Sequence, residues 1–201
     1  MISNVSLIYR YHSLYKVLLK ILYGKYFINR YRDLRSYIPK GDTVLDVCSG
    51  DCNLYHFGIK GRNQYIGADL NISGLKKNRN VDQIQLDLNK DPLPKADIII
   101  LQGSLYQFHS NQKLIIDKLL LSANKKVIIS EPIINIANST NTFFAYIAKY
   151  AVNPGTGHRT KRFTKQSLDD FFQSYYNKII ESRFLIAGGR DLVYILKKNN
   201  H

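Results

Sequence analysis

Short apolar runs alternate with amphipathic stretches through the middle of this chain of 201 residues. Five of the runs are short and rich in β-branched residues, which is typical of buried strands. The predicted strands are residues 43–47, 64–69, 83–87, 97–102 and 126–130. Helical patterns fall between them at residues 53–59, 73–77 and 111–122. Because strands and helices alternate, the pattern predicts a parallel sheet with helices on both faces.

The alternation stops after the fifth predicted strand. Residues 133–162 form an insertion, with an apolar helical piece at residues 142–151 and a basic loop at residues 153–162. Thr164 is then expected to begin a helix that continues through Tyr175, because a threonine hydroxyl can accept from the free amides of a first helical turn.

The chain ends in two further apolar runs, residues 179–186 and 192–196, which flank the pair Gly188 and Gly189. Glycines between two apolar runs favour a tight turn, so the pattern predicts a terminal hairpin with an antiparallel strand. The expected fold class is therefore α/β: a Rossmann-like, doubly wound, mostly parallel sheet with a C-terminal antiparallel hairpin and an N-terminal helical extension.

The first 38 residues differ from the rest of the chain. Apolar residues recur there at three- and four-residue steps, which predicts one or two helices over residues 5–37 with a break at Gly24. Tyrosines alternate with basic residues, which suits either a lid over a bound substrate or a helix packed on the domain with its cations solvated. We divide the chain into a basic, tyrosine-rich extension or lid, residues 1–38, and one domain, residues 39–201.

Composition adds a strong positive charge. The chain has 29 basic and 15 acidic residues, a formal charge of +14, and residues 1–40 hold eight basic residues and one acidic residue. Such a balance favours anionic partners such as phosphates, nucleic acid or an anionic membrane surface. Every apolar run is far shorter than the roughly 20 residues of a membrane span, and no secretory signal is recognisable. We expect a cytoplasmic protein.

Only two cysteines occur, Cys48 and Cys52. A pair four residues apart, with no histidine pair at ligand spacing, makes neither a zinc site nor a disulfide framework. We therefore expect no metal, and a buried packing role for both thiols.

Three consecutive predicted strands end in an acid: Asp46, Asp69 and Asp87. The first is followed by a tight turn of small residues, Cys48-Ser49-Gly50, to which a ligand can approach closely. An acid at the end of the second strand can accept from ribose hydroxyls, and a polar group at the third can meet an adenine. The pattern predicts a nucleotide-sized ligand at the carboxyl ends of the strands.

These motifs resemble those of class I S-adenosylmethionine-dependent methyltransferases. The resemblance covers about residues 40–198 and rests on five segments: VLDVCSG at 44–50, YIGAD at 65–69, QLDL at 85–88, DIIILQGSLYQF at 97–108 and IISEP at 128–132. It implies a seven-stranded sheet that ends in an antiparallel hairpin, S-adenosyl-L-methionine as the cofactor, and methyl transfer as the activity. The family's first and third turn glycines are Cys48 and Cys52 here.

The resemblance also implies a set of cofactor-binding residues. These are Asp46, Cys48, Ser49, Gly50, Asp69, Leu70, Asp87, Leu88, Gln102, Gly103 and Ser104. Asp46 would orient the turn, Asp69 would bind the ribose, and the segment 102–104 would pass beneath the reacting sulfonium. A dinucleotide site is disfavoured, because it needs three glycines, and Asp51 beside the one glycine of this turn would repel a pyrophosphate.

Methyl transfer needs alignment more than it needs a base, but a hydroxyl or ammonium acceptor would require one near the fourth and fifth strands. The candidates are Glu131, Tyr106, His158 and His109. The candidate substrate contacts are Arg159, Tyr9 and Tyr11, because a guanidinium pairs well with phosphate or carboxylate and tyrosines suit an apolar boundary.

The leading hypothesis is methyl transfer to a small-molecule or lipid-like acceptor with an anionic group, together with peripheral contact with an anionic membrane. An RNA methyltransferase is the alternative that the charge and the tyrosines favour, although the Asn/Asp-Pro-Pro-Tyr/Phe motif of base-amine methylating relatives is replaced by Gln102-Gly103-Ser104-Leu105. The third alternative is a non-catalytic adaptor that lost the donor through Cys48 and Cys52. The oligomeric state and the acceptor atom stay open.

Overall fold

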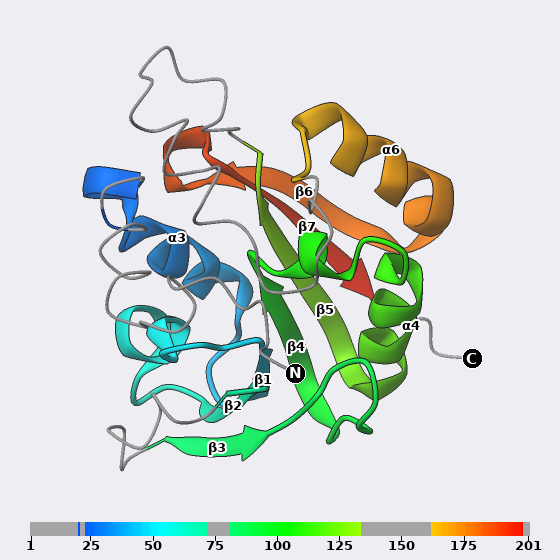
Figure 1. Ribbon diagram of the computed structural model, residues 1–201. Coiled ribbons are helices and arrows are strands. Elements are labelled where there is room, and N and C mark those ends of the chain that lie inside the picture. The colour runs from blue at the N-terminus through cyan, green and yellow to red at the C-terminus, as the bar shows by residue number, and fades with distance from the viewer. Residues whose placement is uncertain (1–19, 21–22, 72–80, 134–161, 199–201) are drawn as a thin grey trace, which may run out of the picture.

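The computed structural model describes residues 20, 23–71, 81–133 and 162–198, in which seven strands form one mixed sheet with the order β3-β2-β1-β4-β5-β7-β6 (Figure 1). The strands are β1 (Thr43–Val47), β2 (Gln64–Asp69), β3 (Asp82–Gln85), β4 (Ala96–Gln102), β5 (Ala123–Pro132), β6 (Ile180–Ile186) and β7 (Asp191–Lys197). β1 to β5 pair in parallel, and β7 runs antiparallel to both β5 and β6. The predicted mostly parallel sheet with a terminal antiparallel hairpin is confirmed.

Helices cover both faces of the sheet. The α-helices are α3 (Asn29–Arg32), α4 (Gln112–Ser122) and α6 (Lys165–Tyr176), and a π-helical turn spans Tyr55–Ile59. Short 3-10 turns lie at Gly24–Tyr26, Asp33–Tyr37, Leu105–Phe108, Asn177–Ile179 and Ala187–Gly189. α3 and the π-helical turn lie on one side of the sheet, and α4 and α6 lie on the other (Figure 1).

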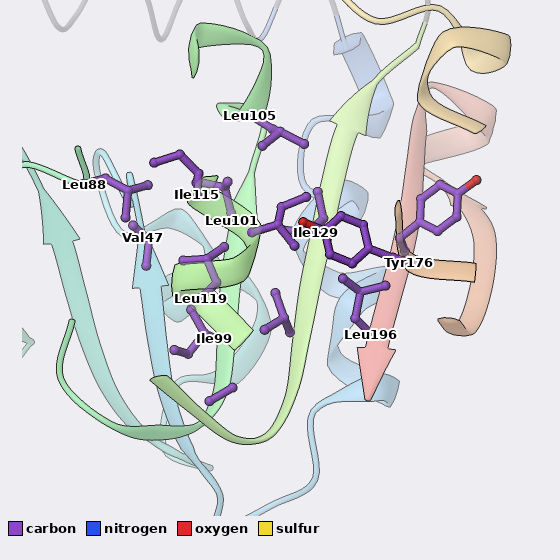
Figure 2. Packing of buried hydrophobic residues seen from close by; sticks show 14 of the residues in the cluster. Val47, Leu88, Ile99, Leu101, Leu105, Ile115, Leu119, Ile129, Tyr176 and Leu196 are labelled. Carbon is purple, nitrogen blue, oxygen red and sulfur yellow. The ribbon is translucent and has the colours of Figure 1, made fainter. Parts of the chain in front are cut away.

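Alternation along β4 explains the two cores. Successive strand residues point to opposite faces, so Ile98 and Ile100 join the apolar cluster under α3, while Ile99 and Leu101 join the cluster under α4 and α6. All four side chains are fully buried. Figure 2 shows the second cluster, where Ile99 and Leu101 lie beside Leu119 of α4. A strand buried on both faces reads as a continuous apolar run, which is why β4 is recognisable from sequence.

The start of α6 is as predicted. The Thr164 hydroxyl accepts from the Ser167 amide at 3.1 Å, and the Ser167 hydroxyl accepts from the Thr164 amide at 2.9 Å. This reciprocal cap satisfies two amides that have no partner in the first turn. On the buried face of the helix, the Phe172 ring stacks on the Tyr194 ring of β7 at 4.0 Å between centroids.

The third strand ends earlier than predicted. β3 stops at Gln85, and Asp87 lies in a turn instead: its carbonyl accepts from the amides of Lys90 and Asp91, and its own amide donates to the Asp91 carboxylate at 2.7 Å. An aspartate followed by a polar stretch closes its own turn, and this local bonding competes with strand pairing.

The described part of the N-terminal extension belongs to the core. Tyr23, Phe27, Tyr31 and Leu34 are buried in the cluster under α3. Gly24 has a φ of +51° and interrupts the segment, and short helical turns follow it in place of one continuous helix. The rest of the predicted extension, most of the insertion 133–162, and the predicted helices at 73–77 and 142–151 lie outside the described residues. Within the described part, no helix is long and apolar enough to cross a membrane.

Candidate functional site

The turn after β1 has the backbone of a three-glycine turn although only one of its three key residues is glycine. Cys48, Gly50 and Cys52 have φ values of +57°, +51° and +55°. The left-handed region is unfavourable for residues with a Cβ by roughly 1–2 kcal/mol. Both cysteines therefore hold the conformation that glycines adopt easily, and the tightness of the turn is preserved.

A glycine on the neighbouring strand makes room for Cys52. A Cβ at Gly67 of β2 would lie 2.7 Å from the Cys52 sulfur and 3.0 Å from the Ser49 hydroxyl. The Cys52 side chain is fully buried, so its sulfur points under the turn toward β2. Cys48 is half-buried and packs against the cluster under α4 and α6. Burial, together with the nearby carboxylates, raises the pKa of the Cys48 thiol, which stays neutral.

Asp46 lies beneath this turn. Its carboxylate is buried and accepts from the Tyr65 hydroxyl at 2.6 Å. Burial raises the pKa of Asp46 to about 7, against the lowering effect of the Tyr65 hydrogen bond, and the charge of Asp69 adds to the rise. The hydrogen bond joins the end of β1 to β2, and the role of Asp46 in orienting the turn stays a prediction.

Asp69 connects the end of β2 to the same turn. Its Oδ2 accepts from the Gly50 amide at 2.9 Å, and its Oδ1 accepts from the Asn71 amide at 3.0 Å. Leu70, the next residue, is 63% exposed, so its side chain is open to a ligand. The ends of β1 and β2 therefore form one unit, with a carboxylate at its rim.

The third acid, Asp87, follows Leu86, whose amide donates to the Asp69 carbonyl at 2.9 Å. Asp87 is partly exposed and pairs with Lys90 at 3.3 Å, and the Asn89 amide together with Lys90 lowers its pKa. Leu88 is 4% exposed and belongs to the cluster under α4 (Figure 2). The assignment of Asp87 and Leu88 to an adenine stays a prediction.

The segment after β4 is held by Glu131. The Ser104 and Leu105 amides donate to Glu131 Oε1 at 2.8 and 2.7 Å, and the Gly103 amide donates to the Ser130 carbonyl at 2.7 Å. Glu131 is 1% exposed, and burial raises its pKa to about 7 in spite of the two amide donors. Glu131 thus positions the segment, and its role as a base stays a prediction.

The remaining base candidates differ in their surroundings. Tyr106 is buried, and the Arg162 guanidinium lies 4.6 Å from the centre of its ring. His109 is exposed beyond the end of the 3-10 turn. The candidates His158, Arg159, Tyr9 and Tyr11 lie outside the described residues.

Sequence reasoning missed a buried ionic cluster beside this segment, which we call the strand-end cluster: Arg30, Tyr23 and Asp191. Asp191 is fully buried at the start of β7 and accepts from the Tyr23 hydroxyl at 2.5 Å and from Arg30 Nε at 3.1 Å. The side-chain Nε2 of Gln102 in β4 donates to the Arg30 backbone carbonyl at 2.9 Å. These residues lie 161 and 168 positions apart in the chain, and no local pattern predicts such a contact.

The site suits a positively charged ligand with a ribose. Asp46, Asp69 and Glu131 all lie close to Cys48, and with a pKa of about 7 Asp46 and Glu131 each carry part of a negative charge at neutral pH. Such a group of acids would attract an ammonium and a sulfonium and would repel a pyrophosphate. The residues present therefore fit S-adenosylmethionine. No three His, Cys, Asp or Glu side chains of the described residues are grouped to hold a metal ion.

The sheet order and the turn at the ends of β1 and β2 define a Rossmann-like α/β fold. Comparison with solved structures narrows this to the class I S-adenosylmethionine-dependent methyltransferase fold. No protein-family model matches the sequence, and no curated protein matches it in a sequence search.

Three of the matching structures illustrate the kinds of methyltransferase to which the fold is similar. Magnesium protoporphyrin IX methyltransferase from Synechocystis PCC 6803, with bound S-adenosylhomocysteine, is 13% identical with a TM-score of 0.60, over 85% of this chain and 82% of that one. Human N-acetylserotonin methyltransferase, in complex with S-adenosylmethionine, is 16% identical with a TM-score of 0.64, over 96% and 58% of the two chains. The 16S rRNA methylase ArmA is 18% identical with a TM-score of 0.54, over 90% and 89%. At these identities the likeness concerns the fold.

Proposed function

We propose that this chain transfers the methyl group of S-adenosylmethionine to a small-molecule acceptor. The observation that carries the proposal is the turn after β1, in which two cysteines keep the backbone of the family's glycines and Gly50 donates to Asp69. A non-catalytic relative would have no need to hold Cys48 and Cys52 in an unfavourable conformation. It would also have no need of a glycine at position 67, where the missing side chain leaves room for the Cys52 sulfur.

Each part of the site has a task in such a reaction. When bound, S-adenosylmethionine supplies a methyl group on a positively charged sulfur, which an acceptor atom displaces in line. Asp69 would accept from the ribose hydroxyls, and the turn 48–52 would line the methionine portion. The segment 102–104, which Glu131 holds from below, would border the reacting sulfonium. Holding these groups still and excluding water is the main contribution that a protein makes to such a displacement.

An acceptor with an anionic group suits the surroundings of the segment 102–104. Tyr106 follows this segment, and the guanidinium of Arg162 lies against its buried ring. Arg162 is partly exposed, and its permanent charge suits a carboxylate or a phosphate. With a pKa of about 7, Glu131 could take up a proton from an acceptor hydroxyl near neutral pH. Contact with an anionic membrane and a cytoplasmic location stay predictions.

RNA is the second candidate acceptor, because the chain carries a charge of +14 and its fold is similar to that of a 16S rRNA methylase. The two candidates differ in how they respond to salt. Binding that rests on phosphate contacts falls steeply as salt rises, whereas binding of a small molecule does not. Transfer of a labelled methyl group to small-molecule, lipid-extract and RNA pools would identify the acceptor class, and label in RNA alone would contradict the first proposal.

Donor binding is tested by calorimetry with S-adenosylhomocysteine. We expect the wild type to bind and Asp69→Ala to weaken binding at least tenfold, because the ribose hydroxyls and the Gly50 amide both lose their acceptor. Asp82→Ala is the matched control, since Asp82 is an exposed acid at the opposite end of the neighbouring strand, and it should bind as the wild type does. If the wild type does not bind, the adaptor hypothesis replaces this one.

A further inference from the structure

Arg30 is a buried cation with an unusual set of neighbours. Its side chain is 5% exposed, and its Nε donates to Asp191 at 3.1 Å. The guanidinium carbon lies 4.3 Å from the centre of the Tyr23 ring and 5.6 Å from that of the Tyr31 ring. A guanidinium is never deprotonated in a protein, so this charge is permanent, and the aspartate and the ring faces stabilise it.

Arg30 also contacts the segment after β4 at two points. The Gln102 side chain donates to the Arg30 carbonyl at 2.9 Å. A Cβ at Gly103 would lie 3.2 Å from Arg30 Nη2, so the guanidinium lies directly against the Gly103 backbone, which has a φ of +66°. A residue other than glycine would be strained at this φ and would push against the guanidinium.

The segment is therefore held from two directions by buried side chains, the carboxyl group of Glu131 and the guanidinium of Arg30. Glu131 of β5 accepts from the amides of Ser104 and Leu105, and Arg30 lies against Gly103 from the N-terminal segment. Gly103, with its positive φ, connects the two anchored ends. If Arg30 were absent, one of the two supports would be lost while the Glu131 contacts remained.

We infer that Arg30 is a positioning residue for donor binding: its guanidinium holds the backbone of Gly103 in the conformation that borders the donor. The inference rests on the proposed function, because it takes the segment 102–104 as part of the donor site. It assigns to the N-terminal segment a role in the site, through a residue that acts on the backbone of Gly103.

The test must separate positioning from stability, because Arg30→Met alone leaves Asp191 as an uncompensated buried charge. The double variant Arg30→Met/Asp191→Asn removes both charges and should recover most of the lost stability. It still lacks the contact with Gly103. We expect its affinity for S-adenosylhomocysteine, measured by calorimetry, to be about tenfold below wild type, because the guanidinium no longer packs against the Gly103 backbone.

Tyr23→Phe is the matched control. It removes a donor to Asp191 and so weakens the same cluster, but it leaves Arg30 against Gly103. We expect lower stability with unchanged affinity. If the double variant regains wild-type affinity together with stability, or if Tyr23→Phe loses affinity to the same extent, Arg30 acts through stability alone and the inference is wrong.

Amide hydrogen exchange gives a readout that needs no ligand. In the double variant the amides of Gly103, Ser104 and Leu105 should exchange faster than in wild type, while those of β1 should not change. Unchanged exchange in this segment would overturn the inference. A wild type that does not bind S-adenosylhomocysteine while the segment exchanges faster in the double variant would instead contradict the proposed function and leave Arg30 as the support of this segment.

Discussion

Two clusters in this molecule are built from the same three residue types, an arginine, an aspartate and a tyrosine. The strand-end cluster consists of Arg30, Asp191 and Tyr23, and a second, outer cluster consists of Arg183, Asp169 and Tyr194. In each, one carboxylate accepts from both a guanidinium and a phenol. The clusters differ in their burial and in what lies next to them.

Contact geometry alone would predict that the outer cluster contributes more to stability than the strand-end cluster. Arg183 binds Asp169 through two nitrogens, at 2.7 and 2.5 Å, whereas Arg30 reaches Asp191 with one nitrogen at 3.1 Å. Exposure reverses the ranking. The two charged side chains are 34% and 22% exposed in the outer cluster, and 5% and 0% exposed in the strand-end cluster. Water can replace a lost partner in the first case and cannot in the second.

The comparison teaches that the environment decides what such a cluster does. The outer cluster connects α6 to β6 and β7 on the face of the sheet that α6 covers. The strand-end cluster joins the N-terminal segment to β7 and lies against the segment after β4. Only the second combines a large effect on stability with contact to the candidate donor site.

The largest expected effect is that of Arg30→Met. Removing one partner of a buried ion pair destabilises by about 3–5 kcal/mol, because the remaining charge is neither solvated nor paired. Chemical denaturation at pH 7 measures the change in the free energy of unfolding. Arg183→Met is the matched control in the outer cluster, and it should lose no more than about 1 kcal/mol. Equal losses in the two variants would contradict the role given to burial.

The next effect concerns Glu131, the other buried side chain that holds the segment after β4. Burial raises its pKa from 4.5 to about 7, so the folded state binds a proton more tightly than the unfolded chain does. The stability from this group is complete below pH 4.5 and is lost as the pH rises through about 7. A shift of this size corresponds to about 3 kcal/mol.

Glu131→Gln cannot ionise and keeps an oxygen that can accept from the Ser104 and Leu105 amides. As the pH rises from 4.5 to 7.5, the free energy of unfolding should fall less in this variant than in wild type. The difference between the two losses should reach up to about 3 kcal/mol. Asp46, whose pKa is raised in the same direction, still contributes its own loss in both proteins. Urea denaturation across this pH range gives the comparison, and identical slopes for the two proteins would contradict the assigned protonation of Glu131.

The smallest effect is expected in the outer cluster. The stability that Asp169 contributes is lost as the pH falls, whereas that of Glu131 is lost as the pH rises. Hydrogen bonds from Arg183 lower the pKa of Asp169, so its contribution is present above the ordinary aspartate pKa and is lost as the pH falls. Asp169→Asn should therefore destabilise at neutral pH by at most about 1 kcal/mol, and by less in acid, because solvent screens an exposed pair. Thermal unfolding at pH 7 and pH 3 measures both, and a larger loss in acid would contradict this assignment.

Much of the fold follows from short-range pattern. β4 has a continuous apolar run because both of its faces are buried, and the Thr164 hydroxyl caps the nearest amides, three residues away. The prediction for β3 was too long, because Asp87 and Asp91 close a turn that competes with the ladder. In the candidate site, the turn and its acids were recognisable as a motif. The direction of the Cys52 side chain was not, since it depends on the space above Gly67.

The alternation of elements, the acids near the strand ends and the small residues of the turn after β1 can be read from the chain, because each of these depends on neighbours a few positions away. Which charges are buried depends on how distant segments pack together. Arg30 and Asp191 read as ordinary polar residues of a basic segment and a hairpin turn, and folding brings them together across 161 positions. Burial is a property of the packed molecule, and it gives Arg30 a place in the candidate site while Arg183, with partners of the same residue types, remains partly exposed.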